Sequence, residues 1–173
     1  MTGSFGFIHE KLEIKILILF VMRHLREPAA FSVLTELVMC DDGISYFDFA
    51  ESVAELVKTE HLRLENNKYS ITQKGVKNGE TTESSLPYSV RVKAEERVSS
   101  YRAAQIRNAL INTSHVPNPE GGCSVMLSLS DGVGEIVALQ LFAVNDKHAR
   151  GLENGFRKNA EAVYNSLLGA ILS

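Results

Sequence analysis

The side chains that could catalyse a reaction or hold a metal are present in this chain, but not at the spacings that such chemistry requires. The five histidines stand apart from one another and from the two cysteines, so no zinc-type ligand spacing occurs. No GxSxG turn presents a serine nucleophile, and no glycine-rich phosphate-binding loop is found. We therefore expect no enzymatic activity, no metal site and no cofactor.

Composition and cysteine usage indicate a cytoplasmic protein. Of the 173 residues, 45% are hydrophobic and 23% charged, which is too apolar for a disordered chain. Cys40 and Cys123 lie far apart and are interpreted as reduced thiols. The longest apolar run, Ile16–Met22, is far shorter than the roughly 20 residues needed to cross a bilayer, and it lacks the flanks of a secretion signal. We expect no membrane association.

The amino-terminal half is predicted to form three helices followed by a hairpin. Residues 9–25 form a predicted helix that is apolar nearly all round, so it should be buried against its own domain and often a partner. A short helix over 32–40, capped by Ser32, precedes a helix over 45–59 with one buried stripe. Two strands, 61–65 and 68–72, are joined by Asn66-Asn67, a pair that tolerates the left-handed conformation of a tight turn.

The carboxy-terminal half is predicted to form a helix, three strands and a long helix. Residues 81–87 have the composition of a linker and separate two predicted domains, 1–80 and 88–173. The predicted helices and strands together make this an α+β protein. Beyond a helix over 89–102, strands are expected at 107–116, 123–130 and 135–144, and a helix at 145–172. The third strand is apolar on both faces, which predicts a central position or cover on both sides. The long helix is expected to cover one face of the sheet. The other face, with Ala138, Gln140 and Phe142, must then be covered by the helix 89–102, a second subunit or a ligand.

Several motifs match a known pattern. Tyr69-Ser70-Ile71-Thr72-Gln73-Lys74-Gly75 resembles the Y-x-[IL]-T-x-x-G signature that closes the wing of bacterial regulators, with Thr72 capping the next helix and Gly75 permitting close packing. Further matching features are Tyr46-Phe47-x-Phe49, the meander around residues 123–144 and Ala160-Glu161-Ala162-Val163-Tyr164. The whole chain resembles an uncharacterised bacterial family, catalogued as a domain of unknown function, with an amino-terminal winged helix-turn-helix.

That resemblance implies a transcriptional regulator that binds double-stranded DNA, and we expect the protein to act as a homodimer. The helix 45–59 would enter the major groove and the wing would contact the backbone, with the two copies about 34 Å apart on a two-fold site. The dimer expectation itself rests on the over-apolar first helix and the partly covered sheet. The recognition-helix candidates are Ser45, Tyr46, Asp48, Ala50, Glu51 and Lys58, and the wing candidates are Arg63, Asn66, Asn67 and Lys68.

Charge argues against this function. The chain has 18 Lys+Arg and 21 Asp+Glu, and residues 1–80 hold 9 and 12 of these, so that half carries all of the net charge of −3. Asp48, Glu51 and Glu55 on the outward face of the predicted recognition helix would repel phosphates. Lys11, Lys15, Lys74 and Lys77 would have to supplement the wing. The alternative is a winged-helix module that contacts proteins and does not bind DNA directly.

One basic concentration lies elsewhere, and its members are Arg91, Lys93, Arg97, Arg102 and Arg107. It is read either as a supplementary surface that contacts the DNA backbone or as an ordinary solvated helix face. The carboxy-terminal domain is expected to be a dimerisation or sensing module, or simply a sheet closed by its own helices. No sequence signature indicates a pocket for a small-molecule effector.

Overall fold

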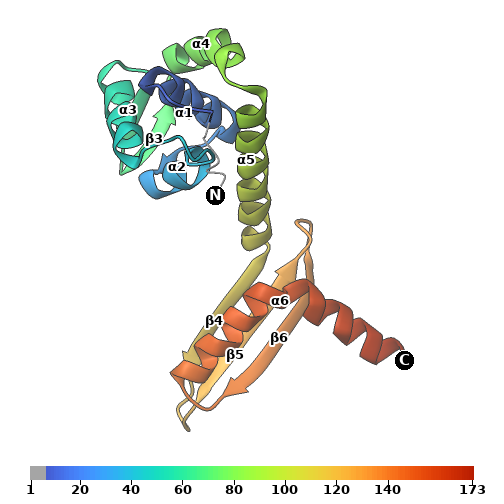
Figure 1. Ribbon diagram of the computed structural model, residues 1–173. Helices are drawn as coiled ribbons and strands as arrows, with labels where there is room; N and C mark the ends of the chain where they lie inside the picture. The colour runs from blue at the N-terminus through green and yellow to red at the C-terminus, as the bar shows by residue number, and fades with distance from the viewer. Residues whose placement is uncertain (1–6) are drawn as a thin grey trace, which may run out of the picture. The chain divides into compact units, whose positions relative to one another are not determined.

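A computed structural model describes residues 7–173 and contains helices, two small antiparallel sheets of three strands each, and a long carboxy-terminal helix (Figure 1). The α+β class is therefore as expected. The chain divides into two units, of which the first ends at Arg102 and the second runs from Ala103 to Ser173. No helix in the described part of the chain is long and apolar enough to cross a membrane.

The first unit contains most of the helices. Its elements are α1 (Lys11–Leu25), β1 (Ala29–Ala30), α2 (Phe31–Val38), α3 (Tyr46–Lys58), β2 (Leu62–Glu65), β3 (Lys68–Ile71), α4 (Gln73–Thr82), the 3-10 turn η1 (Glu83–Ser85) and most of α5 (Tyr88–Ala109). The second unit contains the end of α5, then β4 (Ile111–Pro117), β5 (Cys123–Ser130), β6 (Glu135–Ala143) and α6 (Asp146–Leu172).

Helix α1 forms the centre of the first unit. Its run Ile16–Met22 is entirely buried, and α2, α3, α4 and β3 all contact the helix. The expectation that this helix is buried on several sides is confirmed. Its own unit supplies the cover, so the apolar character of α1 requires no partner.

The hairpin that follows α3 forms as expected. Asn66 and Asn67 have φ values of 49° and 59°, the left-handed geometry of a tight two-residue turn. Thr72 caps α4 by accepting a hydrogen bond from the Gly75 amide at 3.1 Å. A Cβ on Gly75 would lie 2.2 Å from the His61 carbonyl oxygen, so only glycine permits this close approach. The short strand β1, which pairs antiparallel with β3, was not expected.

Three local expectations differ from the structure. The residue that caps α2 is Ala30, and the predicted cap Ser32 lies inside the helix. Residues 81–87, for which composition indicates a linker, contain the end of α4, η1 and the buried Leu86. Helix α5 continues to Ala109, so β4 begins at Ile111 and not at residue 107, because residues 103–109 contain neither glycine nor proline to stop the helix.

The second unit is a meander with strand order β4-β5-β6. The expectation that the third strand is central, or covered on both faces, is wrong: β6 is an edge strand and most of it is exposed. Consecutive hairpins place the second strand in the middle whatever its hydropathy, so β5 is central although one of its faces carries serines. The alternation expected in this strand is confirmed, because Cys123, Val125, Leu127 and Leu129 are buried.

Helix α6 covers one face of this sheet, as expected. Ala149, Phe156 and Ala160 are its buried residues, and they share a core with the inner side chains of β5. The opposite face, with Ala138, Gln140 and Phe142, is exposed. The buried stripe of α5 belongs to the core of the first unit, so residues 89–102 do not provide the missing cover. Cys40 and Cys123 are free and buried, one in each core.

Candidate functional site

Helix α3 is held in place by a buried stripe made of Phe49, Ser52, Val53 and Leu56. Ser45, which directly precedes the helix, is exposed, adopts extended geometry and makes no side-chain capping hydrogen bond. A residue with φ of 61°, Glu60, ends the turn after the helix and directs the chain into β2. Helix α3 therefore has one face in the core and presents the other to solvent beside the hairpin.

Two ion pairs link α3 to α1. Lys11 pairs with Glu51, and four residues further along both helices Lys15 pairs with Glu55. The hydrogen bond to Glu51 raises the pKa of Lys11, and the bond from Lys15 lowers the pKa of Glu55. Two of the three carboxylates expected to repel phosphate are thereby neutralised. In turn, Lys11 and Lys15 are engaged within the unit and do not add free positive charge to it.

The exposed face of α3 is partly aromatic. Phe47 is 82% exposed, and Tyr46 beside it is 52% exposed. The inward stripe at positions 49, 53 and 56 places position 47 on the outward face, together with 51, 54 and 58. Helical spacing alone could therefore have identified Phe47, which was not among the expected contact residues.

The remaining expected residues of α3 have different surroundings. Asp48 and Ala50 are half-buried, whereas Glu51 and Lys58 are exposed. The Tyr46 ring packs edge-on against Phe31, with centroids 6.4 Å apart, and lies 6.5 Å from the Phe49 ring. Tyr46 thus combines an exposed surface with a packing role, so a truncation there would disturb the core as well as the surface.

The hairpin presents its expected residues at the surface. Arg63, Asn66, Asn67 and Lys68 are all exposed. An Arg63 guanidinium nitrogen lies 3.7 Å from a Glu65 carboxylate oxygen, a loose contact between two largely exposed side chains. Tyr69 of β3 lies 6.1 Å from the Phe31 ring, which connects the hairpin to the aromatic cluster at the start of α3.

The free positive charge of this surface lies at the end of α3 and on the hairpin. No ion pair within residues 7–173 involves Lys58 or Lys68. Lys74 instead donates a hydrogen bond of 2.8 Å to the Thr59 carbonyl and so closes the end of α3. Burial, together with Lys74, lowers the pKa of His61, whose ring bonds to the side chains of Thr59 and Asn78.

Part of the basic group on α5 is used internally. Arg97 donates to the carbonyl oxygens of Glu36 and Met39, at 2.6 and 2.9 Å, where α2 ends. Arg107 binds the Arg157 carbonyl at 2.8 Å and pairs with Glu161 at 2.7 Å, on either side of Asn159, where α6 is kinked. These two arginines bind helix ends and carbonyls, as structural residues do, and so weaken the idea of one continuous surface for the DNA backbone.

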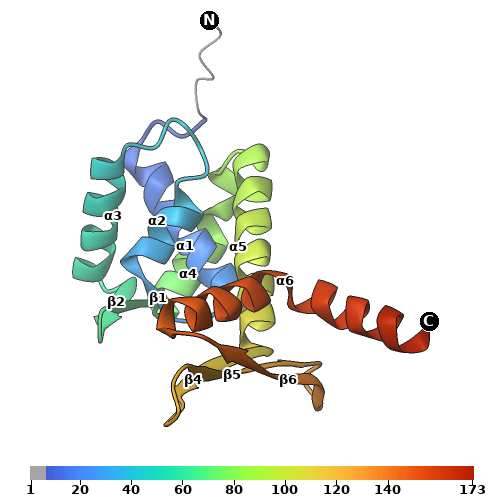
Figure 2. The same cartoon turned by 90° about the horizontal axis from the view of Figure 1, so that it is seen from below.

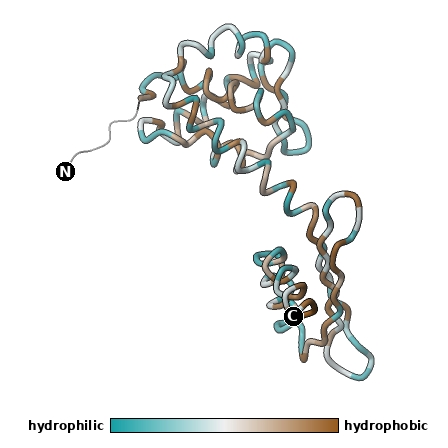
Figure 3. The backbone as a smooth tube through the Cα atoms, turned by 90° about the vertical axis from the view of Figure 1, so that its right-hand side faces the viewer, coloured by the Kyte–Doolittle hydropathy of each residue, from teal (hydrophilic) through white to brown (hydrophobic). Residues whose placement is uncertain are grey.

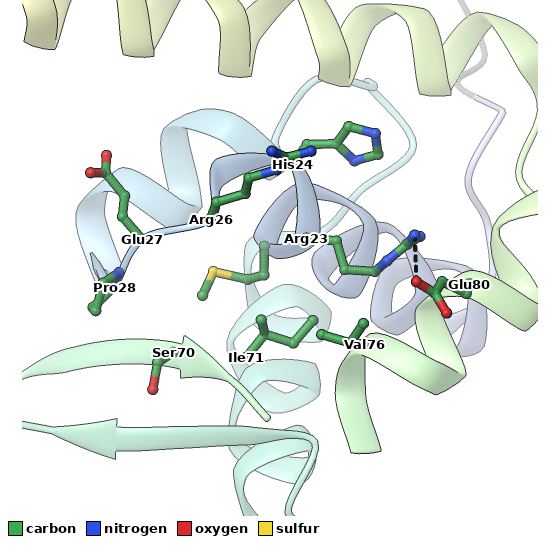
Figure 4. A pocket seen from close by; sticks show the side chains of 10 residues that line it. Arg23, His24, Arg26, Glu27, Pro28, Ser70, Ile71, Val76 and Glu80 are labelled. Atoms are coloured by element: carbon green, nitrogen blue, oxygen red, sulfur yellow. Dashed lines mark hydrogen bonds and ion pairs between the residues drawn. The ribbon is translucent and has the colours of Figure 1, made fainter. Parts of the chain in front are cut away.

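A cleft of about 410 Å³ opens at the carboxy-terminal end of α1 (Figure 4). Its most buried cation, Arg23, is paired with Glu83 at 2.5 Å and with Glu80 at 3.4 Å. Its other lining residues come from the end of α1 and the loop after it, from β3 and from α4: Met22, His24, Arg26, Glu27, Pro28, Ser70, Ile71 and Val76. Arg23 is thereby neutralised within the unit and is not free to bind an anion in the cleft.

The histidines do not assemble with other ligands into a metal centre in the part of the chain that the structure describes. His115 of β4 instead lies between two carboxylates of α6, with 2.9 Å to Asp146 and 3.2 Å to Glu153. The hydrogen bond to Asp146, followed by the bond to Glu153, raises the pKa of His115. Sequence spacing could not reveal this cluster, because its members are brought together only by the packing of α6 on β4.

Residues 14–171 match the family described as a domain of unknown function (DUF4364). The chain belongs to this family. The match spans both units and every helix and strand except the first turn of α1 and the last residue of α6. No curated protein matches the chain, and no solved structure matches it.

Proposed function

We propose that the chain is a cytoplasmic, DNA-binding transcriptional regulator that acts as a homodimer, with a winged helix-turn-helix in its first unit. The element order of that unit supports the proposal: helix, short strand, two helices, then a hairpin with which the short strand pairs. In this assignment α3 is the recognition helix and β2–β3 is the wing.

The observation that carries the proposal is the neutralisation of α3 by α1. Acidic side chains on the docking face oppose DNA binding, because phosphate contacts dominate affinity. With Glu51 and Glu55 paired to lysines, the charges that remain near the wing include Lys58 and Lys68, which form no ion pair with any residue from 7 to 173. Arg63 adds a third cation, loosely paired with Glu65. Phe47, exposed at the start of the same helix, supplies an apolar contact of the kind that meets a thymine methyl group.

The test is selection from a random double-stranded DNA pool at two salt concentrations, followed by affinity measurements on the selected site. We expect a two-fold symmetric site whose affinity falls steeply as salt rises. Arg63→Glu and Lys68→Glu should weaken binding to all sequences, and the loss of each phosphate contact should reduce the salt slope by about 1. Lys147→Glu, at an exposed position of the second unit, is the matched charge-reversal control and should leave binding unchanged.

Base preference is tested at the start of α3 with two variants. Tyr46→Phe keeps the ring against Phe31 and removes only the hydroxyl, while Phe47→Ala removes a side chain that makes little contact with the core. Either change should relax the selected sequence without lowering the stability of the fold. Unchanged affinity in both wing variants would contradict the docking.

The second candidate is a winged-helix module that contacts a protein. The observation that favours it is the same exposed aromatic pair, Tyr46 and Phe47, on a helix face that is close to neutral. Aromatic residues are enriched at the centres of protein interfaces. Failure of the wild-type protein to retain any DNA at the lower salt concentration would overturn DNA binding and favour this module.

A further inference from the structure

The end of α6 is a helix segment without charge. Residues 162–173 contain no Asp, Glu, Lys, Arg or His. Ile171 and Leu172 are 75% and 81% exposed, and Leu168 is exposed as well. A helix that stands in solvent on its own normally carries charged residues on its outer face. This segment therefore has the composition of a helix covered by protein, yet none of the described residues covers it fully.

The direction of this segment is set by contacts at a kink. Asn159 leaves helical geometry, with φ of −128° and ψ of 20°, and its side chain donates to the Gly155 carbonyl at 3.0 Å. Arg107 holds the same region through the Arg157 carbonyl and Glu161. Beyond Ala160, the last buried residue of α6, the helix runs out past the β6 side of the sheet (Figures 1 and 2). Contacts within the second unit therefore set the direction in which residues 162–173 project.

The neighbouring edge of the sheet is also unprotected. Within residues 7–173 no strand pairs with the outer edge of β6. Natural edge strands are guarded by charges, prolines or short length, but residues 136–144 contain neither a charge nor a proline. The opposite edge strand, β4, is shorter and ends at Pro117. Of the two edges of this sheet, β6 is the one suited to pair with another strand.

The inner face of the sheet is incompletely covered along the same strand. The inner residues of β5 are buried, whereas Val137 and Leu139 of β6 are only half-buried and Leu141 is exposed. In Figure 3 the strands of this unit are hydrophobic along much of their length. Helix α6 therefore leaves a strip of apolar surface beside β6, on the face from which its own end projects.

We propose that β6 pairs antiparallel with β6 of a second copy of the chain, and that the uncharged end of α6 of each copy packs on the inner face of its partner's β6. The result is a continuous six-stranded sheet. A segment of twelve residues is about 18 Å long, several times the roughly 4.8 Å between neighbouring strands, so it reaches the partner's β6. The exposed apolar side chains of each copy are then covered by the other.

A second copy fits this surface better than an unrelated protein. One unit carries both the open edge and the overhanging helix, so a two-fold axis lets each copy give and receive the same two elements. Glu135 is the sole charged residue of β6 and lies at its start, so antiparallel pairing places the two carboxylates at opposite ends. The surface offers no charge that would select a charged partner. This inference rests on the homodimer of the proposed function but not on DNA binding.

The experiment is sedimentation velocity over a concentration series, with the full chain. We expect the wild type to dimerise, and Ile171→Glu/Leu172→Glu and Leu141→Lys each to raise the dimer dissociation constant at least tenfold. Leu12→Glu, at an exposed apolar position of α1 in the first unit, is the matched control and should dimerise like the wild type. Circular dichroism establishes that each variant is folded.

Hydrogen exchange locates the contact. Amides of β6 should gain protection as the wild-type concentration rises and lose it in the Ile171→Glu/Leu172→Glu variant, while β4 stays unchanged. A monomeric wild type, or a dimer that survives both variants, would overturn the interface, as would concentration-dependent protection at β4 in place of β6. A dimer that binds no DNA overturns DNA binding and leaves the interface standing. A monomer that binds DNA overturns the interface and the homodimer and leaves DNA binding standing.

Discussion

The first unit encloses its most apolar helix, α1, among helices and a strand, whereas the second covers a three-stranded sheet with one helix on one face. Both contain segments that are apolar on more than one side. In the first unit the chain itself provides every covering element. In the second, β6 and the end of α6 remain exposed. A segment that is apolar on more than one side is therefore expected to be buried. Its sequence does not show whether the residues that cover it belong to the same chain.

The largest expected effect comes from truncating the enclosed helix. Leu17 is fully buried in α1, and Leu17→Ala should lower the stability of the first unit by about 2–5 kcal/mol, because it removes packing and leaves a cavity. Leu12→Ala, on the exposed side of the same helix, should change stability by less than about 0.5 kcal/mol. Because the chain has no tryptophan whose fluorescence could follow unfolding, the stability of each unit is best measured separately by hydrogen exchange. Equal effects of the two variants would contradict the enclosed position of α1.

Glycines in the two units should respond in opposite directions. Gly75→Ala in α4 places a Cβ against the His61 carbonyl and should destabilise the first unit by about 1–3 kcal/mol. Gly155 in α6 has open space around it, so Gly155→Ala should stabilise the second unit by about 0.5–1 kcal/mol through helix propensity. Denaturant titrations of both variants measure the difference. A stabilising Gly75→Ala would show that the close approach at His61 relaxes freely.

Acid should weaken the first unit through Asp41. Burial acts to raise the pKa of this carboxyl, but hydrogen bonds from the backbone amides of Phe7, Ile8 and Gly43 outweigh it and lower the pKa. The stabilisation is therefore present above the ordinary value of 3.8 and is lost as pH falls through the lowered pKa. Asp41→Ala should cost about 1–3 kcal/mol at neutral pH and progressively less in acid. An effect independent of pH would rule out the carboxylate as the cause.

Rising pH should weaken the second unit through His115. Its pKa is raised by the hydrogen bonds to Asp146 and Glu153, so its contribution is complete below the ordinary value of 6.5 and is lost as pH rises through the raised pKa. His115→Gln should remove this loss of stability between neutral and mildly alkaline pH. Hydrogen exchange of β4 and α6 over that range is the measurement. The same pH dependence in the variant would assign it to other groups.

The smallest expected effect is at Ser52, a polar residue inside the enclosed core. Its hydroxyl is buried and has no hydrogen-bond partner among the described residues. Ser52→Ala should therefore raise the stability of the first unit, by less than about 1 kcal/mol. Thr35→Ala is the matched control, because the Thr35 hydroxyl donates to the Phe31 carbonyl at 2.8 Å and its removal loses that bond. A destabilising Ser52→Ala would indicate a partner for the hydroxyl.

Features that depend on neighbouring residues were predictable from the amino-acid sequence. Helical spacing located α3 and its buried stripe, the Asn66-Asn67 pair predicted the hairpin turn, and strict alternation identified the inner face of β5. Thr72 and Gly75 were correctly assigned because capping and close approach act within a few residues or across one hairpin. Each of these is a local property of the chain.

Contacts between residues far apart in the sequence became known only from the packing of the folded chain. The pairing of Lys11 and Lys15 with the carboxylates of α3 joins residues 40 positions apart and reverses the meaning of an acidic helix face. The edge position of β6, the clamp of Arg107 on α6 and the carboxylates around His115 likewise follow from packing. Periodicity shows which face of a segment is apolar. Side chains far apart in sequence become neighbours only when the chain packs.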